Sequence, residues 1–360
     1  MSKLKDKLSI SMSSQSGSGM TGGSGSASVG STVVASTLTP THNQLLRKKY
    51  LDLIEYGNQH PQTTQQNLYQ LRKTILLEGL PDDTEEEKED RRKGSPKCSL
   101  RGLIWKILLG VKDCDAEKYI ELVKRGPSEQ YEKIRKDTSR TFKGDDQFSQ
   151  AVQQDKLSRC LNAFIHLTSD LKQADLKQSL GYVQGMNLLS GAFLYVLPEL
   201  DAFYCFSTMI LQYCHRYCLP KISGVLSALN ILDTILEFVD PELYGYLVSS
   251  KNYDPQLLTH AIISLGASTP PLGEILKLWD FYLAFGVHMN VIGTVSRLLL
   301  MRDSLLADPS PCSQFRSLPD LEAETMINLS IHIVRQLPED LYDLLVDHPI
   351  ADISSQEEFN

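Results

Sequence analysis

Apolar residues recur at helical spacing along most of the chain from residue 98 onward. Large apolar side chains that return every three or four positions form one face of an amphipathic helix. No segment alternates apolar and polar residues between hairpin signals, and no repeat recurs at a fixed period of about 30–50 residues. The pattern therefore predicts an all-α fold built from an irregular set of many helices. The stripes lie at residues 100–108, 157–171, 191–197, 203–213, 225–239, 257–265, 275–285, 291–301 and 326–345.

Two further helices are predicted ahead of that region. The first begins near Thr41 and is expected to end at Gly57. The second begins at Pro61, because proline lacks the N–H that the first helical turn leaves unused, and ends at Gly79. Residues 82–93 are almost entirely charged, with acids first and bases last, and we expect an exposed linker or a solvated helix there.

The first 40 residues contrast with everything that follows. From residue 8 onward they are dominated by Ser, Gly and Thr. Such a segment buries too little apolar surface to offset the entropy of ordering, so residues 1–40 are predicted to be a disordered tail. A regulatory phosphorylation tail is the alternative to a plain solvated extension.

Composition narrows the class of protein. The chain carries 36 Lys and Arg against 44 Asp and Glu, which gives 36 − 44 = −8 and argues against a general nucleic-acid-binding protein. No window of about 18 apolar residues predicts a membrane span, and the basic N-terminus runs into Ser and Gly rather than into an apolar signal segment. Seven scattered cysteines are typical of reduced thiols in an intracellular protein. We therefore expect a cytoplasmic protein without membrane insertion.

Most familiar catalytic motifs are absent. The sequence contains no GxxxxGK[ST] phosphate-binding loop, no GxSxG and no HExxH. Cys214 and Cys218 would share a helical face and could hold zinc, but two further ligands are not evident, and buried cysteines are ordinary in so apolar a segment. His166 lies on an amphipathic helix and is interpreted as a hydrogen-bonded structural residue. The sequence thus predicts no metal site and no bound cofactor.

A first unusual segment surrounds Arg140. Asp137 precedes Arg140 by three positions, the spacing at which a carboxylate reaches a guanidinium across one helical turn. An arginine held in this way at a helix end, before the polar residues 143–147, would project outward in a fixed orientation. The alternative is an ordinary surface ion pair, which contributes little to stability.

A second unusual segment lies at residues 181–187. Gly181 and Gly185 bracket Tyr182 and Gln184 just ahead of an apolar helix. Glycine permits close approach of the backbone to another helix or to a partner molecule. Gln184 would then be presented at a helix N-terminus, with an amide that is free to orient a water molecule. A loop with a closely packed glycine and a capping glutamine is the alternative.

Together these two segments resemble the TBC domain family of Rab GTPase-activating proteins. Ile134, Asp137 and Arg140 match the family's arginine-finger motif IxxDxxR, and residues 182–185 (Tyr-Val-Gln-Gly) match its glutamine-finger motif YxQG. Residues 100–105 (Leu-Arg-Gly-Leu-Ile-Trp) are similar to the family's opening helix. Together with Leu278-Trp279-Asp280 further along the chain, these make four motifs in the right order, and a chance match is improbable.

The resemblance implies a domain organisation. The chain would consist of the tail at 1–40, a helical extension with a charged linker at 41–97, a TBC GTPase-activating domain at 98–347 and a C-terminal tail at 348–360. The domain would have the irregular multi-helix TBC fold.

The resemblance also implies a mechanism in two parts. Arg140 would enter the nucleotide pocket of a small Rab/Ras-like GTPase and neutralise charge on the transferred phosphoryl group, while Gln184 would position the attacking water. Asp137 would hold Arg140, and Tyr182 and Gly185 would shape the loop. Positioning and electrostatics are what chiefly accelerate phosphoryl transfer. This chain would hold no cofactor, since GTP and Mg²⁺ belong to the partner GTPase.

The third family block departs from the common pattern. Leu278-Trp279-Asp280 matches, but residues 261–271 lack the usual aromatic side chains, and Phe285 instead of Glu precedes Gly286. In this the chain resembles the fungal branch that acts in mitotic-exit and septation checkpoint control. Members of that branch act on a Rab/Ras-like mitotic GTPase at the spindle pole body, on the cytoskeleton, together with a separate scaffold subunit.

Two functions remain compatible with these residues. The first is a GTPase-activating protein that acts through both Arg140 and Gln184. The second is a non-catalytic binding module on the same fold, which recruits a GTPase or a scaffold without accelerating hydrolysis, and the altered third block supports it. The sequence leaves open which GTPase is the substrate and whether the isolated chain is active without a scaffold.

Overall fold

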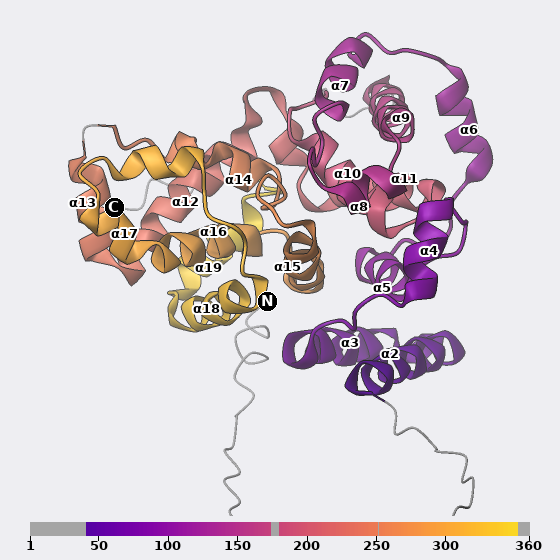
Figure 1. Cartoon of the computed structure of the whole chain (residues 1–360), viewed down its shortest axis with the longest axis horizontal. Coiled ribbons are helices and arrows are strands. Elements are labelled where there is room, and N and C mark those ends of the chain that lie inside the picture. Colours follow the sequence, from indigo (N-terminus) through magenta and orange to yellow (C-terminus); the bar gives the residue numbers. More distant parts are fainter. Residues whose placement is uncertain (1–40, 174–179, 251, 352–360) are drawn as a thin grey trace, which may run out of the picture.

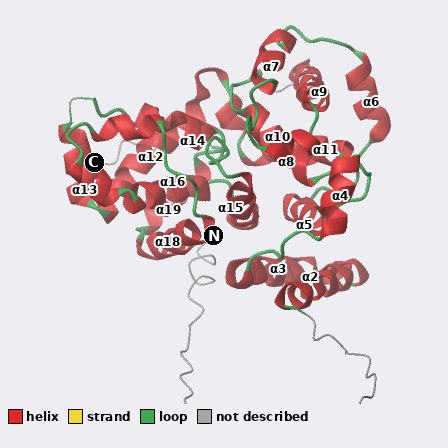
Figure 2. Ribbon diagram, in the orientation of Figure 1, coloured by secondary structure: helices red, strands yellow, loops and turns green. Residues whose placement is uncertain are grey.

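The computed structural model describes residues 41–173, 180–250 and 252–351. Every regular element in these ranges is a helix (Figure 2), which confirms the predicted all-α fold class. The predicted tail at 1–40 lies outside the described residues. Within the described ranges, no helix combines the length and the apolar character that crossing a membrane requires.

The described part of the chain begins with a pair of helices that lie side by side along one edge of the molecule (Figure 1). Gly57 does not end the first of them, contrary to the prediction. A glycine inside a helix costs only about 1 kcal/mol, whereas a proline excludes the helical conformation from the residue before it, so the helix continues almost to Pro61. The predicted end at Gly79 is confirmed, with a φ of 67°. The elements are α2 (His42–Gln59), the 3₁₀ turn η2 (Pro61–Thr63) and α3 (Thr64–Glu78).

The middle of the chain forms one side of the molecule, around the long helix α9 (Figure 1). Helices α6, α7, α10 and α11 all contact α9. The elements are α4 (Glu85–Lys93), α5 (Leu100–Leu109), α6 (Ala116–Lys124), α7 (Tyr131–Thr138), α8 (Asp146–Ala151), α9 (Gln154–Gln173), α10 (Met186–Val196), α11 (Glu199–Thr208) and the π-helical turn η3 (Met209–Tyr213).

The C-terminal part forms the other side, in which α12 and α16 are central (Figure 1). Helix α15 lies between the two sides and contacts α3, α5, α16 and α18. The elements are η4 (His215–Cys218), η5 (Pro220–Ile222), α12 (Ser223–Val239), α13 (Pro241–Ser249), η6 (Pro255–Leu258), α14 (Thr259–Ile263), α15 (Leu272–Phe285), α16 (Met289–Leu300), α17 (Arg302–Ala307), η7 (Pro311–Arg316), α18 (Ala323–Gln336) and α19 (Glu339–Asp347).

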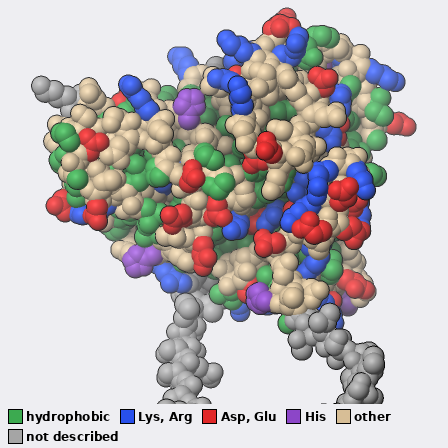
Figure 3. All heavy atoms as spheres, in the orientation of Figure 1, with side chains coloured by type: hydrophobic (Ala, Val, Ile, Leu, Met, Phe, Trp, Pro, Cys, Tyr) green, Lys and Arg blue, Asp and Glu red, His purple; other side chains and the backbone are tan. Residues whose placement is uncertain are grey.

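The charged run at 82–93 is more ordered than an exposed linker. Thr84 and Glu87 form a reciprocal capping box at the start of α4, and acids at its start with bases at its end suit the helix dipole. Glu87 is buried. Its carboxylate also accepts a hydrogen bond from the backbone N–H of Leu100 at 2.7 Å and pairs with Arg47, and these partners compensate for its burial. Figure 3 shows the resulting mixture of acidic and basic side chains over this part of the surface.

A buried carboxylate joins α5 to α15. Asp280 is 3% exposed and accepts hydrogen bonds from Nε of Arg101 at 3.1 Å and from Nε1 of Trp105 at 2.8 Å. The ring of Trp105 packs against Trp279 and Phe193, with ring centroids 5.8 and 5.6 Å apart. Both tryptophans are buried in the core.

The described chain continues in the core beyond residue 347, where the C-terminal tail was expected to begin. His348 is fully buried. Its Nε2 lies 2.8 Å from the hydroxyl of Tyr217, and its backbone oxygen accepts a hydrogen bond from Arg216 at 2.9 Å. Sequence spacing gave no sign of these partners, which lie more than a hundred positions away along the chain.

The buried network at Asp280 leads to a stability prediction. Asp280→Ala should lower the free energy of unfolding by about 3–5 kcal/mol, because it leaves the guanidinium of Arg101 buried without its close partner. Urea unfolding followed by circular dichroism measures the change. Asp303, an exposed aspartate on α17, is the matched control, and Asp303→Ala should change stability by less than about 0.5 kcal/mol. Equal effects of the two substitutions would contradict this account of the core.

Candidate functional site

Arg140 follows the end of α7 and is held by the residue predicted to hold it. Its Nη2 donates to Oδ1 of Asp137 at 2.6 Å, and its Nε donates to the same oxygen at 3.2 Å. The side chain of Arg140 is 52% exposed, whereas that of Asp137 is only 5% exposed. The ion pair therefore has one anchored partner and one that reaches into solvent, unlike a surface pair in which both side chains are mobile.

Asp137 is in turn fixed by Tyr182 from the second segment. The hydroxyl of Tyr182 donates to Oδ2 of Asp137 at 2.9 Å, so both carboxylate oxygens are engaged. Burial, together with the negative charge of Asp137, raises the pKa of Tyr182 well above its ordinary value. The phenol therefore stays protonated near neutral pH and remains a donor. The two unusual segments of the sequence thus meet in space.

The loop that carries Gln184 is anchored at Tyr182, two positions before it. The backbone N–H of Tyr182 donates to Oε1 of Gln130 at 2.7 Å, and Nζ of Lys133 donates to the backbone oxygen of Tyr182 at 3.1 Å. Gln184 itself is exposed, and its side chain makes no hydrogen bond to any residue that the structure describes. Its amide is thus presented on a restrained backbone and is free to bind elsewhere.

Gly185 is required by the backbone conformation at the start of α10. Its φ is 111°, in the left-handed region that residues with a side chain rarely adopt. A Cβ at this position would also lie 3.2 Å from Cγ2 of Ile263. The glycine therefore allows the chain to turn sharply after Gln184 and to pack closely against α14.

Asn187 connects the two segments and was not singled out from the sequence. Its Oδ1 accepts from the backbone N–H of Gly185 at 3.2 Å, and its Nδ2 donates to Oγ1 of Thr141 at 2.9 Å. The residue is 5% exposed. The available sequence signal was an amide residue two positions after the loop glycine. Its partner Thr141 lies 46 positions away along the chain, and only the tertiary fold brings the two together.

Arg140 and Gln184 line one open hollow of about 570 Å³. The ionisable side chains on its lining are those of Arg140, Lys143, Asp145 and His260, and the carboxylate of Asp145 caps α8 by accepting from the N–H of Phe148 at 2.8 Å. The hollow thus offers two exposed cations and an amide, but no hydrogen-bonded pair of nucleophile and base among its described lining residues. Such a surface is suited to supplying groups to a bound partner rather than to carrying out chemistry on its own.

The stretch that departs from the common third block forms a wall of this hollow. Ile263, Ser264, Ser268 and Pro271 all line it. By contrast, Phe285 lies at the far end of α15 and lines a different pocket. The unusual composition of residues 261–271 therefore alters the surface beside Arg140 and Gln184, whereas the Phe285 position does not.

The remaining residues considered in the sequence analysis are His166, Cys214 and Cys218, and their contacts are those of structural residues. His166 Nε2 lies 2.9 Å from the backbone oxygen of Gly126, as predicted for a hydrogen-bonded structural histidine. Cys214 and Cys218 are both buried in the core. Across the described part of the chain, no group of three or more His, Cys, Asp or Glu side chains is placed to hold a metal ion.

Comparisons with known proteins agree on one family. Residues 98–306 match the model of the Rab-GTPase-TBC domain. The chain is 62% identical over 322 residues to "Putative mitotic check point protein BUB2" of Dictyostelium discoideum, covering 89% of this chain and 85% of that protein. It is 34% identical over 289 residues to "Cell division control protein 16" of Schizosaccharomyces pombe, covering 80% of this chain and 90% of that protein.

Solved structures show the same fold. A crystal structure of the Ypt/Rab-GAP domain of Gyp1p superposes with a TM-score of 0.58 at 16% identity, covering 76% of this chain and 93% of that one. The Chlamydomonas flagellar RabGAP TBC domain superposes with a TM-score of 0.50 at 19% identity, covering 86% of this chain and 96% of that one. The predicted irregular multi-helix fold is thereby confirmed.

The hydrogen bond between Tyr182 and Asp137 can be tested directly. Tyr182→Phe should lower the free energy of unfolding by about 1–3 kcal/mol, because Oδ2 of the buried Asp137 loses its donor. Tyr131→Phe is the matched control on α7, because the hydroxyl of Tyr131 makes no hydrogen bond to any residue that the structure describes. Denaturant titration of both variants measures the difference. An effect of Tyr182→Phe no larger than that of the control would refute the anchoring role.

Proposed function

The chain belongs to the family of Rab-GTPase-TBC domain proteins, and on this premise we propose that it is a GTPase-activating protein in mitotic checkpoint and septation control. Its substrate is a Rab/Ras-like small GTPase, for which it accelerates the hydrolysis of bound GTP. One observation carries the proposal: Arg140 and Gln184, 44 positions apart, are both exposed on the lining of one hollow.

Arg140 is the residue that stabilises charge in the transition state. The guanidinium enters the nucleotide site of the bound GTPase and neutralises charge that develops on the transferred phosphoryl group. Its pairing with the buried Asp137 supports this role, since a pre-oriented side chain loses less conformational entropy when the partner binds. The remaining guanidinium donors face solvent and are available to phosphate oxygens.

Gln184 positions the attacking water. Its exposed amide can accept from a water molecule and donate to a neighbouring oxygen, which fixes the direction of attack. The loop is restrained by Gln130, Lys133 and Asn187, so the amide approaches from a defined backbone position. The GTP and the Mg²⁺ are carried by the partner GTPase.

A scaffold subunit and a location at the spindle pole body complete the proposal. Both follow from the resemblance to the fungal checkpoint branch. The altered wall at 261–271 supports a need for a further subunit, because it changes the surface beside both fingers. The same wall also favours the alternative of a non-catalytic module that binds a GTPase without accelerating hydrolysis.

Arg140→Ala should abolish the stimulation of GTP hydrolysis, a loss of about 10³–10⁵-fold in rate. Single-turnover hydrolysis by candidate Rab-like GTPases measures it, with and without a scaffold subunit. Arg135→Ala removes an exposed arginine from α7, the helix that precedes Arg140, and is the matched control that should retain activity. Near-full activity of Arg140→Ala would refute the arginine assignment, and binding without any stimulation by the unaltered chain would favour the non-catalytic module.

Gln184→Ala should slow the stimulated reaction by about 10²-fold, because the attacking water loses its orientation. Binding of the complex with GDP and aluminium fluoride, which mimics the transition state, should weaken in parallel. Gln153→Ala removes an exposed glutamine outside the hollow and serves as control. An unchanged rate for Gln184→Ala would mean that the GTPase uses its own glutamine.

A further inference from the structure

A second pocket, of about 240 Å³, lies where five segments of the chain meet. Its lining comes from α3, the end of α5, the turn η3, the end of α15 and α19. It shares no lining residue with the hollow that contains Arg140 and Gln184. Six of its thirteen lining residues are aliphatic or phenyl side chains: Leu108, Leu109, Leu283, Phe285, Val287 and Val346.

Arg72 lies in this pocket without a counter-charge. Its Nε is buried and has no hydrogen-bond partner, and the side chain makes no ion pair with any residue that the structure describes. Asp343 also lines the pocket but does not pair with it. Burial lowers the pKa of Arg72.

His288 provides a second unsatisfied group in the same pocket. The residue is 8% exposed, and its Nε2 is buried without a hydrogen-bond partner. Its ring lies directly over Gly286, where an added Cβ would come within 2.3 Å of Cε1 of His288. Gly286 therefore allows the imidazole to sit on the lining of the pocket. Burial lowers the pKa of His288 to about 4, so the ring is neutral at physiological pH.

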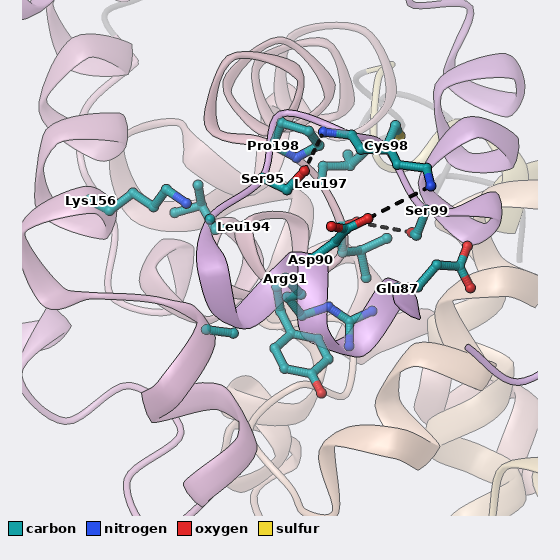
Figure 4. Close-up of a pocket in the computed structure, with 15 residues that line it drawn as sticks. Glu87, Asp90, Arg91, Ser95, Cys98, Ser99, Lys156, Leu194, Leu197 and Pro198 are labelled. Carbon is teal, nitrogen blue, oxygen red and sulfur yellow. Dashed lines mark hydrogen bonds and ion pairs between the residues drawn. The ribbon is translucent and has the colours of Figure 1, made fainter. Parts of the chain in front are cut away.

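Buried polar groups in folded proteins are normally hydrogen-bonded, so two such groups on one pocket need an explanation. A smaller cavity between α4 and the end of α10 shows the usual situation (Figure 4). It has a volume of about 30 Å³, room for one water. There Ser99 donates to the backbone oxygen of Val196 at 3.1 Å, and Ser95 accepts from the N–H of Lys97 at 3.2 Å.

We propose that the pocket lined by Arg72 and His288 binds a small organic carboxylate with an apolar body. The carboxylate would pair with the guanidinium of Arg72, which is only half-buried, and rotation of the His288 ring would bring its buried Nε2 within hydrogen-bonding distance of the ligand. The apolar body would occupy the space beside Phe285 and the leucines. A cavity of roughly 150 Å³ already holds a benzene ring, so 240 Å³ accommodates a ring together with a carboxylate.

The test is calorimetric titration of the full chain with three phenyl compounds, two of them carboxylates and one an amide. 3-Phenylpropionate represents a free acid, N-acetylphenylalanine represents the C-terminus of a peptide, and 3-phenylpropanamide is the uncharged control. At least one of the two carboxylates should bind, and it should bind about tenfold or more tightly than the amide. Binding of N-acetylphenylalanine alone would identify a peptide terminus as the source of the carboxylate.

Two variants separate binding from folding. Arg72→Met should lose at least about tenfold in carboxylate affinity while its thermal midpoint stays unchanged or rises, because an unpaired charge is removed from a half-buried position. Phe285→Glu would supply an internal carboxylate beside Arg72 and should likewise abolish binding. Lys73→Met removes the neighbouring positive charge on α3, outside this pocket, and should change neither property.

Two results would overturn the proposal. One is equal binding of the amide and the carboxylates, or no binding of any probe. The other is a clear fall in the thermal midpoint of Arg72→Met with carboxylate affinity unchanged, because Arg72 would then have a structural role. The stimulation of GTP hydrolysis is not used in this test, so its outcome is independent of the proposed function.

Discussion

A buried carboxylate connects helices from the two sides of the molecule. Asp280 on α15 accepts hydrogen bonds from Arg101 and Trp105 on α5, and Arg101 also approaches Asp83 ahead of α4, at 3.7 Å. A buried charge is tolerated only when its partners are correctly placed. This group therefore ties α5 and the segment ahead of α4 to α15 through charged and hydrogen-bonded contacts.

The same physical rule operates at the candidate site on a smaller scale. Arg140 and Gln184 are exposed, yet each is attached to a buried polar network. Asp137 accepts from both Arg140 and Tyr182, and Asn187 links the loop after Gln184 to Thr141. Exposure makes the two side chains available to a partner, while the buried hydrogen bonds keep their backbones in place.

The buried polar atoms of Arg72 and His288 have no hydrogen-bond partners and lie in a different part of the molecule. Around Asp137 both carboxylate oxygens have donors, whereas Nε of Arg72 and Nε2 of His288 have no partner in a pocket large enough for a ligand. A satisfied network stabilises the fold, and an unsatisfied one retains binding energy for a ligand. The two sites share no lining residue, so one chain can offer a surface for a GTPase and a separate pocket for an acid.

The sequence by itself determined what depends on neighbouring positions. Helical spacing of apolar residues indicated the all-α class, and the three-residue spacing of Asp137 and Arg140 indicated their ion pair, because both follow from the geometry of a single helix. Tertiary structure alone decided the pairing of Asp137 with Tyr182, 45 positions away, and the burial of Glu87 and His348. Spacing carries no information about partners that distant helices bring together, since their choice depends on how the whole core packs.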